Sequence, residues 1–333
     1  MIICRTPYRI SFFGGGTDYP EWYRENGGAV LSTTINKFSY ITLRHLPPFF
    51  EYRHRIRYYH REEVNSVDEI RHPSIRECFR YMKIDRGIDL VHHGDLPAQS
   101  GLGTSSTFTV GLLHGLHALQ YRMPTKRQLA LGAIEVEQRR IGECVGSQDQ
   151  TAAAFGGVNL IEFGGPQEVL VTPLILSPQR IAHLHDHMLL FFTGLQRQAS
   201  EIAAEQVRTL KDRRAELTEM MALVHEAVQI LASEQDILEF GRLLNHQWEI
   251  KRTLSAGISN PTIDTIYTHA MAAGATGGKL LGAGGGGFML FVVSPERQRA
   301  VKEALSGLLH VPFRFDVAGS QIIYHAPTTD FED

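Results

Sequence analysis

Apolar residues follow strand-like and helix-like patterns in the first third of the chain. Residues 2–13 alternate as in a strand, and residues 28–44, rich in β-branched and aromatic side chains, predict two strands or one bent strand. Residues 88–92 predict a short strand. Phe108 opens a run of apolar positions at helical spacing that ends at Leu119. Between this strand and this helix lies a glycine-containing loop.

The rest of the chain is predicted to alternate helices with strands. In order, the pattern predicts a helix at 126–142, a strand pair at 158–176, a buried strand at 187–193, a helical region at 197–232 interrupted near 211–214, a helix at 237–254 and a strand at 288–293. A length of 333 residues permits two domains. The best boundary lies at Ser177-Pro178, so we expect an N-terminal domain at 1–178 and a C-terminal domain at 179–333.

Composition and charge exclude several classes of protein. The net charge of -3 gives no general attraction to nucleic acid or to a membrane surface. Cys4, Cys78 and Cys144 are odd in number and scattered, which fits neither a disulfide framework nor a zinc site. No basic and apolar leader begins the sequence, and no apolar run approaches the length of a membrane span. We expect a cytoplasmic monomer or homodimer.

A basic stretch between residues 53 and 61 contains Arg53, His54, Arg55, Arg57, His60 and Arg61. It is interpreted as a solvated strand or hairpin, because the rest of the chain does not extend it into a nucleic-acid surface. If it has a function, we expect it to bind a phosphate on a small substrate.

The loop at residues 94–103 precedes a helix that begins with three hydroxyl side chains. Free amides at a helix N-terminus attract anions, and glycines let a phosphate approach the backbone. A hydroxyl in the first turn could also bind magnesium. The alternative is a tight turn followed by a Ser/Thr helix cap. The chain has no Walker motif, and no acidic residue follows Gly103 at the distance that a dinucleotide fold requires.

Three other polar features accompany glycines. Arg9 and Asp18 flank Gly14-Gly15-Gly16, which is either a ligand-binding segment or a turn with a local side-chain bond. Asp149 either caps a helix or orients and deprotonates a hydroxyl that attacks a phosphate. The cluster from Gly282 to Gly287 precedes a strand rather than a helix, so it is not a dinucleotide fingerprint.

Together, three of these segments resemble the motifs of the GHMP kinase superfamily, which includes galactokinase, homoserine kinase, mevalonate kinase and phosphomevalonate kinase. The segments are PYRISFFGGGTDY at 7–19, PAQSGLGTSS at 97–106 and GAGGGG at 282–287, in the family order. The resemblance implies an α/β (α+β) fold in two domains. The N-terminal domain is expected to resemble domain 2 of ribosomal protein S5, the C-terminal domain to be ferredoxin-like, and the active site to lie between them.

The resemblance also implies a role for each matching residue. The expected catalytic residues are Asp149 and Arg9, and the expected cofactors are ATP and Mg²⁺. ATP is expected at Pro97, Ser100, Gly101, Leu102, Gly103, Thr104, Ser105 and Ser106. Magnesium is expected at Ser105 and Glu137, with Glu135 as the alternative carboxylate. The residues expected to contact the acceptor substrate are Gly15, Gly16, Thr17, Asp18, Gly146, Arg197, Lys251 and Gly285.

Within the superfamily, the segments GSQDQ at 146–150, FTGLQR at 192–197 and WEIK at 248–251 resemble the bacterial D-glycero-D-manno-heptose 7-phosphate kinases. These enzymes phosphorylate the anomeric hydroxyl of a sugar that already carries a phosphate. Gly15 and Gly16 stand where galactokinases have an acidic residue and a histidine, which argues against galactose. A kinase for fucose or a hexose, and a non-catalytic sugar and ATP sensor, are the alternatives. We expect the partners to be ATP and a sugar phosphate, without nucleic acid or membrane.

Overall fold

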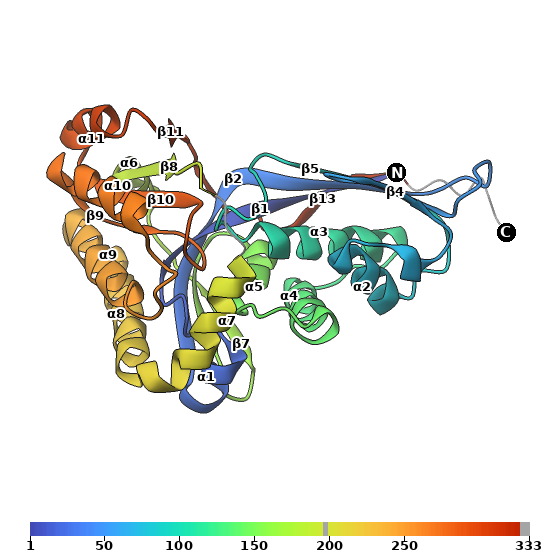
Figure 1. Ribbon diagram of the computed structural model, residues 1–333, viewed down its shortest axis with the longest axis horizontal. Coiled ribbons are helices and arrows are strands. Elements are labelled where there is room, and N and C mark those ends of the chain that lie inside the picture. The colour runs from blue at the N-terminus through green and yellow to red at the C-terminus, as the bar shows by residue number, and fades with distance from the viewer. Residues whose placement is uncertain (196–198, 327–333) are drawn as a thin grey trace.

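The computed structural model of the protein describes residues 1–195 and 199–326 (Figure 1). Within these residues the strands form two separate sheets. No helix in the same part of the chain combines the length and apolar character needed to cross a membrane.

The larger sheet is built around two long antiparallel strands. Its strands are β1 (Ile2–Phe13), β2 (Gly28–His45), β3 (His54–Arg57), β4 (Arg61–Val64), β5 (Ile88–Gly94), β6 (Val158–Phe163), β7 (Val169–Pro173), β12 (Phe315–Asp316) and β13 (Gln321–His325). The main order is β13-β1-β2-β5-β3-β4, with β6 and β12 pairing with β2 and β7 pairing with β6. β3 runs parallel to β5, with β4 and a helix between them in the chain, and the other pairs are antiparallel.

Helices cover one face of the outer half of this sheet (Figure 1). They are α2 (Pro73–Met82), α3 (Thr104–Leu119), α4 (Lys126–Ile134) and α5 (Gln148–Phe155), and a short helix, α1 (Pro20–Asn26), connects β1 to β2. Ile41 and Leu43 of β2 point into this helical layer and are buried, whereas Tyr40, Thr42 and Arg44 alternate with them on the other face.

The smaller sheet has the strand order β11-β8-β10-β9. Its strands are β8 (Met188–Phe192), β9 (Ala275–Leu280), β10 (Phe288–Val293) and β11 (Leu309–His310). The accompanying helices are α6 (Pro178–Asp186), α7 (Ala199–Thr209), α8 (Arg214–Ala232), α9 (Ile237–Lys251), α10 (Pro261–Ala272) and α11 (Gln298–Ala304). Every residue of β10 is buried, as expected for a strand covered on both faces.

Most of the predicted elements are confirmed, and three features are defined more closely. The expected strand at 28–44 is one continuous strand, and the helix at 126–142 changes after α4 into a π-helix at Glu135–Ile141. The interruption near 211–214 is a 3₁₀ turn at Leu210–Arg213. The domain division at residue 178 remains a prediction. Two strands near the end of the chain, β12 and β13, pair with β2 and β1 of the larger sheet.

Candidate active site

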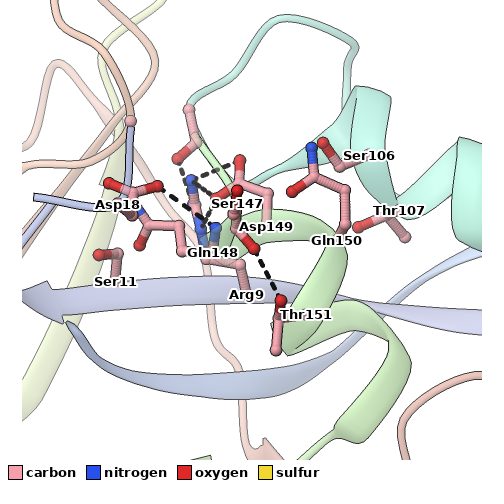
Figure 2. A network of polar contacts seen from close by, with 12 residues as sticks. Arg9, Ser11, Asp18, Ser106, Thr107, Ser147, Gln148, Asp149, Gln150 and Thr151 are labelled. Carbon is pink, nitrogen blue, oxygen red and sulfur yellow. Dashed lines mark hydrogen bonds and ion pairs between the residues drawn. The ribbon is translucent and has the colours of Figure 1, made fainter. Parts of the chain in front are cut away.

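Arg9 connects three segments that are far apart in the sequence (Figure 2). Its Nε and Nη2 donate to Oδ1 and Oδ2 of Asp149, each at 2.8 Å, and its Nη1 donates to the Gly101 carbonyl at 2.7 Å. The Arg9 side chain is 3% exposed and that of Asp149 is 24% exposed, so the carboxylate still reaches the solvent. A two-pronged pair of this kind fixes both the position and the orientation of the carboxylate.

The loop before α3 has the shape of an anion-binding loop. Gly101 and Gly103 have φ angles of 83° and 72°, which non-glycine residues seldom adopt. A Cβ on Gly101 would lie 2.4 Å from the Leu281 carbonyl oxygen, so the second and third glycine segments are in close contact. Because α3 begins at Thr104, the amides of its first turn have no partner within the helix and can bind an anion.

Asp18 holds the first glycine segment against the start of α5. Its Oδ1 accepts a hydrogen bond from the Gly16 amide at 3.0 Å, and its Oδ2 accepts one from the Gln148 amide at 3.3 Å. The residue is 2% exposed. Burial raises the pKa of Asp18, and the nearby charge of Asp149 acts in the same direction. In this arrangement Asp18 positions the backbone on both sides of the cleft.

Gly146→Ala is expected to destabilise this contact, because a Cβ at Gly146 would lie 1.9 Å from Oδ2 of Asp18. We expect the free energy of unfolding to fall by about 1–3 kcal/mol, the usual cost of overpacking. Urea denaturation measures this change. Gly307→Ala is the matched control, since a Cβ there meets nothing within 4 Å. Equal stability of the two variants would contradict the close packing of Gly146 on Asp18.

Two buried lysines lie beneath the glycine segments. Lys251, on α9, donates to the Gly282 carbonyl at 2.6 Å, and Lys279, on β9, donates to the carbonyls of Ser11 and Phe12 at 3.0 and 2.8 Å. Burial lowers the pKa of Lys251 to about 8, and the positive charge of Arg9 adds to this effect. Burial also lowers the pKa of Lys279. The Lys279 bonds connect the smaller sheet to the end of β1, and the Lys251 bond connects α9 to the third glycine segment.

Glu137 is buried on the π-helix next to α3. Its Oε2 accepts hydrogen bonds from the Ser106 hydroxyl, at 2.7 Å, and from the Gln150 side chain. Its Oε1 is buried without a hydrogen-bond partner, and the nearby Thr109 hydroxyl donates to the Ser105 carbonyl. Burial raises the pKa of Glu137 to about 7. The alternative carboxylate, Glu135, forms an ion pair with Arg139 at 2.9 Å on the outside of the helix.

The polar groups surround one cleft of about 270 Å³. Of the residues predicted from the sequence, those that line it are Arg9, Gly15, Gly16, Asp18, Gly101, Gly103, Thr104, Ser105, Ser106, Gly146, Asp149 and Lys251. The structure thus brings residues from all three glycine segments, from α5 and from α9 to one place. The roles that the resemblance gives to individual side chains remain predictions.

The other predicted residues lie around the cleft without lining it. Thr17 is buried and its hydroxyl donates to the carbonyls of Gly14 and Ala29, at 2.8 and 2.9 Å, so it fastens the first glycine segment. Ser100 and Leu102 are completely buried, whereas Pro97 is exposed.

Gly285 faces the segment before α10, where its amide donates to the Ile258 carbonyl at 3.0 Å. Glu137 lies behind the cleft wall, in contact with Ser106. Arg197 lies outside the described residues.

The basic stretch at 53–61 forms the antiparallel hairpin of β3 and β4, as predicted. Within the described part of the chain, none of its residues lines the cleft. Among the described residues that line the cleft, one is an arginine, Arg9, and one is a lysine, Lys251. Arg9 is paired with Asp149, whereas the Lys251 ammonium donates to the neutral carbonyl of Gly282.

Sequence reasoning missed several lining residues, namely Ser11, Tyr19, Gln99, Glu143, Cys144, Val145, Gln148, Ala203, Gln206, Gly282 and Ala283. Ser11, Gln148 and Gly282 lie within segments that carry the family resemblance, so their position in those motifs is a signal that could have identified them. Nothing in the pattern marks Glu143, whose pKa is raised by burial. Its position depends on how the chain leaves the π-helix.

Comparisons with known proteins match both parts of the chain. Residues 72–157 match the family described as GHMP kinases N terminal domain, and residues 220–310 match the family described as GHMP kinases C terminal. The chain is 29% identical over 316 residues to the D-glycero-alpha-D-manno-heptose 7-phosphate kinase of Campylobacter jejuni, covering 90% of this chain and 92% of that protein.

Two further relatives extend these matches. The chain is 27% identical to L-fucokinase/L-fucose-1-P guanylyltransferase of Bacteroides fragilis, over 90% of this chain but 35% of that protein. A crystal structure described as a D-glycero-D-manno-heptose 1-phosphate kinase of Bacteroides thetaiotaomicron superposes with a TM-score of 0.77 and 27% identity, covering 97% of this chain and 99% of that one.

Proposed function

The chain belongs to the GHMP kinases, phosphotransferases with an alcohol group as acceptor, and on that premise we propose that its acceptor is D-glycero-D-manno-heptose 7-phosphate. The proposed reaction transfers the γ-phosphoryl group of ATP to the anomeric hydroxyl and gives the 1,7-bisphosphate. Such a product serves the synthesis of nucleotide-activated heptose and surface polysaccharide. The observation that carries the proposal is the carboxylate of Asp149, fixed by Arg9 at the mouth of a glycine-lined cleft.

In this mechanism the chain mainly positions the reactants. The amides at the start of α3 bind the nucleotide phosphates, and Asp149 holds the sugar hydroxyl. Asp149 accepts the hydroxyl proton as the new O–P bond forms and the bond from the γ-phosphorus to ADP breaks, with ADP as the leaving group. Arg9 holds the Asp149 carboxylate in a fixed orientation through two hydrogen bonds. Because phosphoryl transfer passes through a loose transition state, orientation and electrostatic stabilisation contribute more than the strength of the base.

Ser105 and Glu137 are proposed to hold magnesium. Mg²⁺ prefers oxygen ligands, and Glu137 offers a buried oxygen, Oε1, without a hydrogen-bond partner. Ser105 is exposed in the first turn of α3 and lines the cleft. The ion, when bound, neutralises negative charge on the transferred group. Among the described residues, no group of three His, Cys, Asp or Glu side chains is placed to hold a metal ion.

Lys251 is proposed to bind the phosphate that the substrate already carries. Lys251 lies next to Gly15, where a Cβ would be 3.9 Å from the Lys251 Nζ. Because Gly15 has no side chain, there is room beside the ammonium group. Cationic Lys251 binds a phosphate, whereas the neutral amine does not attract it. Since its pKa is about 8, the affinity for the sugar phosphate is expected to fall as the pH rises through 8.

Lys251→Arg and Lys251→Met test this assignment. The Met variant is expected to raise KM for the sugar phosphate by roughly tenfold or more, the scale of a lost charge-assisted hydrogen bond, with KM for ATP little changed. Between pH 7 and 9.5, KM for the sugar phosphate should rise in the wild type and stay flat in the Arg variant, because arginine does not titrate there. A parallel rise in the Arg variant would contradict the role of Lys251.

The substrate itself is tested by ADP release with magnesium and ATP. Heptose 7-phosphate is compared with unphosphorylated heptose, mannose, fucose and galactose. Turnover confined to the 7-phosphate supports the proposal, whereas turnover of fucose would favour the activity named for the Bacteroides fragilis relative. Silence with every sugar, while ATP still binds, would favour a sensor of the same fold.

A further inference from the structure

Three arginines converge on one buried carboxylate at the start of β5, far along the strand from the loop that precedes α3. Asp89 is 4% exposed as a side chain and accepts hydrogen bonds from Arg44 Nε at 2.9 Å, from Arg55 Nε and Nη2 at 3.0 and 2.7 Å, and from Arg57 Nη2 at 3.3 Å. Arg44 on β2 and Arg55 on β3 both align with Asp89 in the sheet register. We name Arg44, Arg55, Arg57 and Asp89 the guanidinium cluster.

The cluster carries more positive charge than its own carboxylate can neutralise. Arg55 already binds both oxygens of Asp89, which satisfies the buried charge. Counted over the described residues that pair with Asp89, Arg44 and Arg57 therefore leave an excess of two positive charges. The neighbouring Glu63 is paired with Arg61, so that pair leaves the excess unchanged. The N-terminal ammonium group also lies near Arg44. Three guanidiniums around one carboxylate repel one another, and a bound anion would remove that repulsion.

The cluster faces the solvent on the uncovered side of the sheet. Arg44 alternates with Leu43, which points into the helical layer, so Arg44 lies on the opposite face of β2. The side chains of Arg44 and Arg57 are 42% and 45% exposed, whereas that of Arg55 is 16% exposed. Arg55 is held in place by Phe50, whose ring centre is 5.0 Å from its Cζ, and Phe50 stacks on Tyr52.

We propose that the guanidinium cluster binds the phosphate dianion of a small metabolite, at a site separate from the catalytic cleft. Guanidinium groups match phosphate oxygens with paired N–H donors, and two half-exposed arginines beside a fixed third provide such donors on one surface. The two excess positive charges would neutralise the two negative charges of a phosphate dianion. β5 leads from this site to the loop before α3, so an occupied cluster and the nucleotide loop share one strand.

The test follows the Nε–H signals of arginine by NMR while inorganic phosphate replaces chloride at constant ionic strength. In the wild type, we expect the signals of Arg44, Arg55 and Arg57 to shift together and to saturate. In Arg44→Gln/Arg57→Gln, which keeps the Arg55 pair with Asp89, phosphate binding read from Arg55 should weaken at least tenfold. Arg299→Gln, which removes a 90% exposed arginine from α11, is the matched control and should bind as the wild type does.

Further arms identify the source of the phosphate. Glycerol 3-phosphate that binds as tightly as inorganic phosphate points to a phosphate ester, and inorganic phosphate that binds better points to free phosphate. Arg57→Lys should bind phosphate more tightly than the double variant but less tightly than the wild type, because lysine keeps the charge without the paired donors. Signals that respond equally to chloride and phosphate, or a double variant that binds phosphate as tightly as the wild type, would overturn the proposal.

Discussion

Asp149→Asn is expected to lower the turnover number by roughly 10²-fold or more, the usual contribution of a group that accepts a proton in the transition state. The amide keeps the shape of the side chain but cannot accept the hydroxyl proton, and it presents an N–H group toward one of the Arg9 donors. ATP binding should persist, because the loop proposed to bind the nucleotide precedes α3 and is formed by other residues. Steady-state kinetics and equilibrium dialysis with ATP measure the two effects separately.

Glu216→Gln provides the control for this loss of charge. Glu216 pairs with Arg213 at 3.1 Å near the start of α8, and it does not line the cleft. Its substitution should leave turnover within about twofold of the wild type, since surface pairs contribute little. Near-normal turnover in Asp149→Asn would contradict the catalytic assignment, and loss of ATP binding would show that the substitution disturbs the loop as well.

Arg9→Gln is expected to lower the free energy of unfolding by about 3 kcal/mol, the lower end of the cost of breaking a buried ion pair. The substitution removes two donors from Asp149 and one from the Gly101 carbonyl, and no other described cation pairs with that carboxylate. We choose the lower end because Asp149 is 24% exposed and water can partly replace the arginine. Denaturant unfolding followed by circular dichroism measures the change, and turnover should fall together with stability.

A double-mutant cycle separates the pair from the effects of each residue alone. If Arg9 and Asp149 interact as described, the loss of stability in Arg9→Gln/Asp149→Asn should be smaller than the sum of the two single losses. Arg139→Gln breaks an exposed ion pair with Glu135 and should cost at most about 1 kcal/mol. Strict additivity in the cycle would mean that the two side chains are not coupled in solution.

The family and the order of the strands and helices were predicted from local sequence patterns. β1, the β6–β7 pair and α9 follow from periodicity, because a side chain's face is set by its own secondary structure. The glycine segments were also recognised, since positive φ angles and close backbone contacts demand glycine. Gly101 and Gly146 illustrate this, because a Cβ at either position would collide with a distant segment.

The sequence by itself determined these elements and the family, because both depend on residue types at short and regular spacing. Only the tertiary structure decided which polar groups meet. The bidentate contact of Arg9 with Asp149, the Lys251 ammonium beneath Gly282, and the burial of Glu137 behind Ser106 connect residues that are distant in the chain. The convergence of Arg44, Arg55 and Arg57 on Asp89 depends likewise on strand register. Such contacts are set by packing between elements, for which local spacing carries no signal.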